Sequence, residues 1–166
     1  GTGKLRKVDI TGGPPQTICE SPTGADGSWS QEGVILFDGQ DSDPIWEVPA
    51  SGGIAKVKVP GDPKKGITAT GWPVFLPDGK HFLYVLSGEV AKDGVYLGTL
   101  DNAAVDNPNG RRLLPDRASI AFAPPGSASS HGHILFIRET SVMAQPFDTK
   151  SFRLAGDAFQ VAGQVT

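Results

Sequence analysis

The chain has 166 residues, a formal net charge of −3, and 22 glycines and 14 prolines. This length allows one sizeable hydrophobic core and is too short for two ordinary domains. Basic and acidic residues are interleaved, and the densest basic groups are only pairs (Lys64-Lys65 and Arg111-Arg112), which argues against nucleic acid or an anionic membrane surface as a partner. No apolar run has the length of a membrane span, so we expect no membrane insertion by this chain.

The glycines and prolines are spread between short apolar runs, and no helix-length stretch shows apolar residues at helical spacing. The sequence therefore predicts an all-β chain of many short strands joined by turns. The pattern begins inside a strand, and no signal peptide precedes Gly1, which indicates a processed or truncated chain. The single Cys19 excludes an internal disulfide, and we expect it to be a small buried apolar residue.

The first part of the chain predicts a partial unit and then a complete one. The partial unit, residues 4–20, has strands at 5–10 and 16–19. The complete unit, residues 27–60, has strands around Trp29 and at 34–37, 45–48 and 54–59. The run at 34–37 is apolar throughout, which is typical of a strand covered on both faces. The strand at 54–59 alternates, with Lys56 and Lys58 expected to face water.

Residues 70–115 and 118–163 predict two further units of four strands. Their strands are expected at residues 72–76, 81–86, 94–100 and 111–114, and then at 119–123, 133–138, 142–147 and 158–162. An insertion at residues 127–132 lengthens one connection in the last unit.

A recurring turn follows the first strand of each complete unit. The turn closes at a glycine, and these glycines are 46 and 47 residues apart, each with an aromatic residue (Trp29, Phe75 and Phe122) four positions before it. The third strands also align, residues 5–13 with 45–53 at an offset of 40, and residues 95–101 with 142–148 at an offset of 47. Four-stranded repeats of about 45 residues are typical of β-propeller blades.

These units make one partial β-propeller domain, residues 1–166, with about three and a half blades of four antiparallel strands. Each blade has two apolar faces that only neighbouring blades can cover. An incomplete ring would therefore expose a large apolar patch. We expect either that a second copy completes the ring as a homodimer or that the chain belongs to a larger protein.

Three segments carry a family resemblance: residues 27–30 (GSWS), 72–84 (WPVFLPDGKHFLY) and 143–148 (MAQPFD). They resemble the TolB-type, WD-repeat-like β-propellers of bacteria, in particular those in the C-terminal region of membrane-anchored serine/threonine kinase-like proteins. The resemblance covers nearly the whole chain. It implies a ring of roughly six to eight blades that binds proteins or ligands, often in the periplasm or otherwise outside the cytoplasm. It brings no catalytic residue to this chain, which departs from the pattern at Gln31-Glu32, where Pro-Asp is usual.

No catalytic motif is present. The sequence has no G-x-S-x-G elbow, P-loop, G-x-G-x-x-G, H-E-x-x-H or cysteine pair for zinc. We therefore assign no catalytic residue and no cofactor. His131 and His133, with His81 as a third candidate ligand, have the residue type for a zinc site. The interpretation we prefer is a polar loop that enters a strand.

A second group of residues has the oxygen ligands that calcium prefers. Asp38, Asp41 and Asp43 crowd one loop, but the spacing and the glutamate of an EF-hand are missing. We prefer a solvated turn, so no metal is expected in either group.

Two further features have a structural and a functional interpretation. Trp29, Phe75 and Phe122 could line a ligand pocket, although equivalent repeat positions more often pack one blade on the next. His81 follows a turn, and we expect its ring to hydrogen-bond a neighbouring strand or turn and so hold blades together.

The function predicted from these observations is a non-catalytic scaffold that binds a protein or peptide through the loops of a rigid ring. The alternative is a propeller hydrolase or lyase with polar or metal-binding residues in the central channel, for which His131, His133, Asp41 and Asp43 would be tested first. A third hypothesis is that the chain has no function apart from a complete ring.

Overall fold

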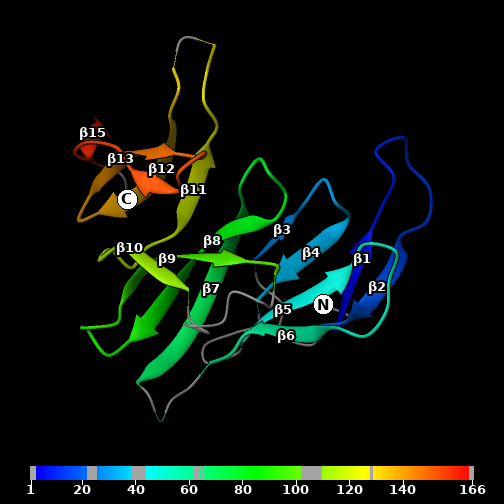
Figure 1. The fold of residues 1–166 in the computed structure, drawn as a ribbon. Helices are drawn as coiled ribbons and strands as arrows, with labels where there is room; N and C mark the ends of the chain where they lie inside the picture. Colours follow the sequence, from blue (N-terminus) through cyan, green and yellow to red (C-terminus); the bar gives the residue numbers. More distant parts are fainter. Residues whose placement is uncertain are drawn as a thin grey trace.

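The computed structural model describes residues 3–21, 26–38, 44–61, 64, 66–101, 110–127 and 129–164. The regular structure within these ranges is β-strand without α-helix, and we find there no long apolar helix of membrane-spanning length. The strands form four antiparallel sheets that follow one another along the chain (Figure 1). We call these sheets blades 1 to 4.

Blade 1 has two strands and blade 2 has four. Blade 1 pairs β1 (Lys4–Lys7) with β2 (Gln16–Glu20), and blade 2 has the order β3 (Gly27–Trp29), β4 (Val34–Phe37), β5 (Ile45–Pro49) and β6 (Lys56–Val59). Each strand lies beside the one before it in the sequence.

Blade 3 repeats this order, and blade 4 adds a short fifth strand. Blade 3 contains β7 (Ile67–Phe75), β8 (His81–Gly88), β9 (Gly94–Thr99) and β10 (Arg111–Leu114). Blade 4 contains β11 (Ile120–Ala123), β12 (Gly132–Arg138), β13 (Ser141–Asp148), β14 (Arg153–Leu154) and β15 (Phe159–Ala162). Both β14 and β15 pair with β13, at different positions along it.

This arrangement confirms the predicted all-β fold, a β-propeller that is incomplete in one chain. The offset of 40 residues places β1 at the position that β5 has in blade 2, so blade 1 consists of a third and a fourth strand. The first strands of the complete blades converge, because β3 and β11 both lie against β7.

Buried apolar side chains form a separate cluster at each junction between consecutive blades. In β4, Leu36 joins the cluster shared with blade 3, while Ile35 and Phe37 join the cluster shared with blade 1. In β8, Tyr84 faces blade 2 and Val85 faces blade 4 in the same way. The prediction that residues 34–37 are covered on both faces is thus confirmed.

A buried carboxylate connects blades 2 and 3. Asp38, at the end of β4 and 4% exposed, accepts hydrogen bonds from the backbone N–H of Asp26 (2.8 Å) and of Trp72 (3.1 Å). The register of β7 shifts between Gly71 and Val74, and Trp72 has a positive φ of 48°. A Cβ at Gly71 would lie 2.9 Å from Asp38 Oδ2, so glycine makes room for the carboxylate.

Several strand details differ from the prediction: β1 ends at Lys7 and not at residue 10, and β6 begins at Lys56 and not at residue 54. The strand β7 begins at Ile67, and not at residue 72, because residues 67–71 continue the pairing with β8. Lys58 does not face water: its Nζ donates to Leu100 O (2.6 Å) and lies 3.5 Å from Glu47, and only 7% of its side chain is exposed. Cys19 is buried, as expected, in the cluster between blades 1 and 2.

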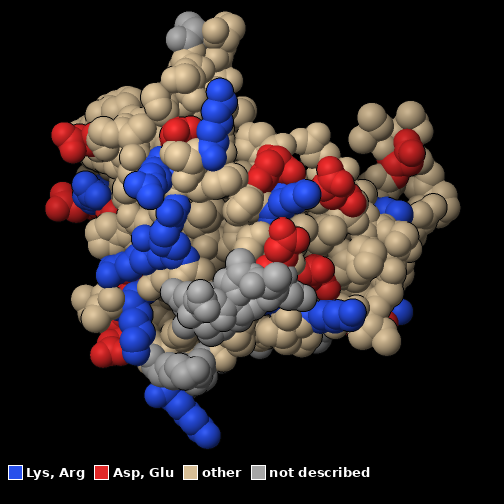
Figure 2. All heavy atoms as spheres, in the orientation of Figure 1, with Lys and Arg blue, Asp and Glu red and all other residues tan. Residues whose placement is uncertain are grey.

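Charged side chains are unevenly distributed on the face drawn in Figure 2. Basic side chains are concentrated on the side of blades 3 and 4, whereas acidic ones are more frequent over blade 2. In the chain segments of blades 3 and 4, Arg138 pairs with Asp116 (2.8 Å) and Arg117 with Asp93 (3.2 Å). Ion pairs therefore balance part of the positive charge of these two chain segments.

Candidate functional site

A pocket of about 260 Å³ lies where β3, β7 and β11 end; we call it the first-strand pocket. It is lined by residues from equivalent positions in three blades: Ser28, Trp29, Ser30, Gln31, Phe75, Leu76, Pro77, Phe122 and Pro124. All of them belong to a first strand or to the turn that follows it, so the repeat itself builds the pocket.

The three aromatic side chains of this pocket combine the two interpretations that the sequence left open. Phe75 packs edge-on against Phe82, with ring centroids 6.1 Å apart, and Phe122 packs in the same way against Phe147 at the same distance. Both rings are half-buried in their own blades and still border the pocket. Trp29 differs, since 55% of it is exposed.

Hydrogen bonds between blades 2 and 3 fix one wall of the pocket. The backbone N–H of Phe75 donates to Ser28 Oγ (3.0 Å), and Gln31 Nε2 donates to Pro77 O (2.8 Å). No Lys, Arg, Asp or Glu is among the described residues that line the pocket. A neutral, partly aromatic pocket of this kind suits an apolar or aromatic side chain of a ligand.

His81 hydrogen-bonds a turn, as the structural interpretation predicts, but this bond stays within blade 3, and it is ring packing that brings the side chain against blade 4. Its Nδ1 is 2.5 Å from Asp78 Oδ2, and its ring centroid is 4.0 Å from that of Phe152 in blade 4. Partial burial raises the pKa of Asp78, but hydrogen bonds from the backbone N–H and the ring of His81 and from the backbone N–H of Lys80 outweigh burial and hold this pKa below its usual range. The histidine therefore connects a turn of blade 3 to blade 4.

Of the other predicted site residues, the structure describes His131, His133 and Asp38, and none of these three lines the first-strand pocket. The Nδ1 of His131 lies 3.2 Å from Ser130 Oγ, and His133 on β12 packs edge-on against Phe159, with ring centroids 5.8 Å apart. Both oxygens of Asp38 accept backbone hydrogen bonds, as described above. Asp41 and Asp43 lie outside the described residues. In the described ranges no three His, Cys, Asp or Glu side chains are grouped as metal ligands.

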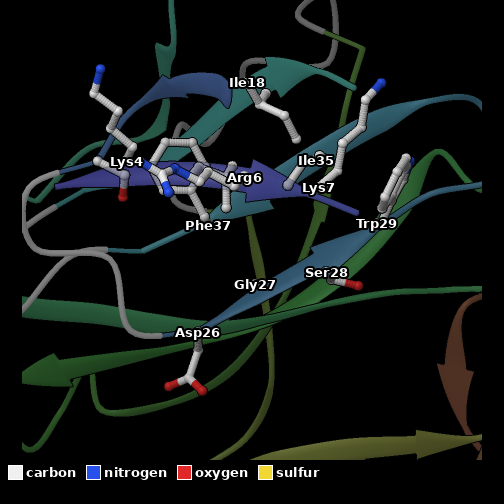
Figure 3. A pocket seen from close by; sticks show the side chains of 12 residues that line it. Lys4, Arg6, Lys7, Ile18, Asp26, Gly27, Ser28, Trp29, Ile35 and Phe37 are labelled. Carbon is white, nitrogen blue, oxygen red and sulfur yellow. The ribbon is translucent and has the colours of Figure 1, made fainter. Parts of the chain in front are cut away.

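A second cavity, of about 330 Å³, lies between β1 and β3 and was not expected from the sequence; we call it the edge trough (Figure 3). Its lining includes Lys4, Arg6 and Lys7 of β1, and Ile35 and Phe37 of β4. Trp29 lines both the edge trough and the first-strand pocket. The signal that could have revealed the trough is the partial unit at residues 4–20, which has only outer strands.

Solved structures with a similar fold are TolB proteins. The chain aligns with the putative TolB from Agrobacterium tumefaciens with a TM-score of 0.65 and 16% identity, over 96% of this chain and 57% of that one. It aligns with TolB from Acinetobacter baumannii with a TM-score of 0.63 and 20% identity, over 91% of this chain and 36% of that one. These likenesses establish a TolB-like β-propeller fold and confirm the predicted resemblance at that level.

The chain thus spans 57% and 36% of the length of these two proteins. No model of a protein family matches the chain, and no curated protein gives a significant match. The link to kinase-like proteins remains a prediction from the resemblance.

Proposed function

We propose that this chain is a non-catalytic β-propeller scaffold that binds a protein or peptide partner at the first-strand pocket. The observation that carries the proposal is the convergence of three aromatic residues (Trp29, Phe75 and Phe122), from equivalent positions of three blades, on one pocket. In a binding site of this design, a partner inserts an apolar side chain between rigid aromatic walls.

The packing of the pocket supports this proposal. Phe75 and Phe122 are held by aromatic neighbours in their own blades, so their rings are positioned before a ligand arrives. Trp29 is large and exposed, and tryptophan is among the residues that most often dominate binding energy at interfaces. Because the lining is uncharged, affinity at this pocket should depend little on salt concentration.

The setting of this scaffold is part of the proposal. Since TolB-like propellers are bacterial in the resemblance and often lie outside the cytoplasm, we place the chain in a larger bacterial sensor or periplasmic protein. Completion of the ring by a second copy is the other arrangement expected from the sequence.

The proposal is tested by selecting binders from a displayed library of random peptides and measuring affinities by titration calorimetry. We expect enrichment of peptides with an aromatic or branched apolar residue. Trp29→Ala should weaken their binding by about thirtyfold or more, which corresponds to a hot-spot residue. The control is Val90→Ala, which truncates an exposed apolar side chain in the connection between β8 and β9.

Two results would contradict the proposal. One is selected peptides whose affinity is the same for wild type, Trp29→Ala and Phe122→Ala. The other is reproducible turnover of an ester, peptide or phosphate substrate that is lost on replacing a single residue such as His133, which would favour the propeller hydrolase or lyase.

A further inference from the structure

Three arginine side chains from separate elements lie close together on blades 3 and 4. We call them the arginine row: Arg112 on β10, Arg117 in the connection between β10 and β11, and Arg138 at the end of β12. Arg112 Nη1 donates to Ala91 O (3.0 Å) and Arg117 Nη1 donates to Asp93 Oδ2 (3.2 Å), so both guanidinium groups lie at the connection between β8 and β9. Arg138 binds Asp116, which precedes Arg117 in the chain. The row is therefore continuous in space although its members are distant in sequence.

The acidic partners of these arginines lie beneath them. The side chain of Arg117 is 61% exposed and that of Asp93 only 7%, while Arg138 is 46% exposed and Asp116 only 11%. The other oxygen of Asp93 accepts a hydrogen bond from the backbone N–H of Gly88 (2.6 Å), which holds the carboxylate inside the blade. The ion pairs are neutral in sum, but the surface that they present to solvent is positive.

The guanidinium groups are held in place and retain donors. Asp116 accepts from both Nε and Nη2 of Arg138 (2.8 Å each), and the guanidinium carbon of Arg138 lies 5.2 Å from the ring centroid of Phe136. A Cβ at Gly94 would lie 2.9 Å from Arg112 Nε, so glycine leaves room for this side chain. A guanidinium has five N–H groups, and the contacts with described residues use one or two of them in each arginine. The other N–H groups can bind a ligand without the cost of ordering a mobile side chain.

The positive charge of the row is local. Figure 2 shows basic side chains concentrated on the side of blades 3 and 4, the two blades that carry the row. Two exposed acidic side chains lie near it: Glu89, which pairs with Lys92 (2.7 Å), and Glu139, which follows Arg138 in the chain. The whole chain has a formal net charge of −3. The ligand that fits best is therefore a short run of negative charge.

We propose that the arginine row binds an acidic segment of a partner protein. Aspartate and glutamate carboxylates accept paired N–H donors from guanidinium groups, and such charge-assisted hydrogen bonds are stronger than neutral ones. Complementary charge also selects among partners and accelerates association. A nucleic acid fits less well, because its regular phosphate charges would continue past the row to Glu89 and Glu139.

This surface is distinct from the first-strand pocket and adds a second contact to the proposed scaffold. The strand β11 lies between the two sites, since Arg117 comes before it and Pro124, which lines the pocket, comes after it. The two sites also differ in chemistry, because the pocket lining is uncharged and the row is cationic. Binding at the row should therefore depend strongly on salt concentration.

The test uses short peptides of equal length that carry an uncharged dye, titrated with the chain and followed by fluorescence anisotropy. A peptide in which glutamate and serine alternate should bind, and its affinity should fall about fivefold or more as salt is raised from about 0.05 M to about 0.5 M. Peptides with glutamine or lysine in place of glutamate should bind about tenfold more weakly or less. Single-stranded oligothymidylate with the same number of negative charges is the nucleic-acid comparison.

Substitutions within the row separate charge from geometry. Arg112→Ala and Arg117→Ala should each weaken binding of the glutamate peptide about two- to fivefold, and the double variant about tenfold. Arg117→Lys retains the charge but not the planar fork, so its affinity should lie between those of wild type and Arg117→Ala. Arg112 donates to a carbonyl and forms no ion pair with a described residue, so Arg112→Ala leaves no buried charge unpaired and should unfold in urea like wild type.

The matched control is Lys80→Ala, which removes one exposed positive charge at the opposite end of β8 and should leave the affinity unchanged. Phe122→Ala alters only the first-strand pocket and should also leave binding of the glutamate peptide intact. If this peptide fails to bind while uncharged peptides still bind at the pocket, the proposal for the row is wrong and the proposed scaffold function stands.

Three other outcomes would overturn the proposal. The first is an equal loss of affinity in Lys80→Ala and Arg117→Ala, which would indicate a general effect of net charge. The second is tighter binding of oligothymidylate than of the glutamate peptide through the same arginines, which would make the row a nucleic-acid site. The third is a wild-type dimer in sedimentation experiments that Arg112→Ala converts to a monomer, because a second copy would then occupy the row.

Discussion

Replacing Asp38 with alanine removes the carboxylate that links the end of β4 to Asp26 and to Trp72. A hydrogen bond to a charged group contributes about 1.5–3 kcal/mol, so the loss of two should lower the free energy of unfolding by about 3–6 kcal/mol. Asp38 is 4% exposed, and water cannot easily replace the lost acceptor. Domains of this kind have a total stability of about 5–15 kcal/mol, so Asp38→Ala should be close to unfolding.

The measurement is urea denaturation followed by tryptophan fluorescence. Asp38→Asn retains one acceptor oxygen but presents an amide N–H to the other donor, so it should lose about half as much stability as Asp38→Ala. The control is Asp26→Ala, because Asp26 contributes its backbone N–H and its side chain is exposed, and this variant should stay within about 0.5 kcal/mol of wild type. A loss below about 1 kcal/mol in Asp38→Ala would refute the proposed role of the carboxylate.

Three further predictions concern blades 1 and 3. A Cβ at Gly98 would lie 2.5 Å from Cζ of Phe82, so Gly98→Ala should lower the free energy of unfolding by about 1–3 kcal/mol. The measurement is urea denaturation, and an unchanged midpoint would contradict this packing. Hydrogen bonds to Asp78 lower its folded pKa, so the stabilising effect of this carboxylate is present above the unfolded pKa of about 4 and is lost as the pH falls through the folded pKa. The difference in stability between wild type and Asp78→Asn should therefore shrink on acidification from pH 6 to pH 3. A constant difference would argue against this role of the hydrogen bonds. Burial, and to a smaller extent the neighbouring Glu20, raise the pKa of the Cys19 thiol, so this thiol should react slowly with disulfide reagents until urea unfolds the chain.

The strand pattern could be predicted because each blade repeats local signals. The apolar run at residues 34–37 became the doubly covered strand β4, and the turns that close at Gly33 and Gly79 follow β3 and β7 as expected. Contacts between distant segments were harder to predict. The sequence places Lys58 in an alternating, solvent-facing pattern, but the carbonyl of Leu100 and the carboxylate of Glu47 draw its side chain inward.

The candidate site was only partly predictable for a related reason. The equivalence of Trp29, Phe75 and Phe122 is visible in the spacing of the repeat, but whether such residues pack or line a pocket depends on how three blades converge. The edge trough depends on how β1 lies beside β3 and β4, which no motif marks. In the sequence, spacing groups Asp38 with the neighbouring aspartates. In the structure its oxygens accept hydrogen bonds from the backbone N–H of Asp26 and from that of Trp72, and Trp72 is more than thirty residues away in the chain.

The three apolar clusters each join only two blades, and this has a consequence for how the molecule comes apart. Such an assembly behaves as a row of nearest-neighbour couplings, in which a disturbance at one junction need not reach the next. Among the described strands, β8 packs in two of these clusters and β2 in one, so amide protons of β2 should exchange with solvent before those of β8.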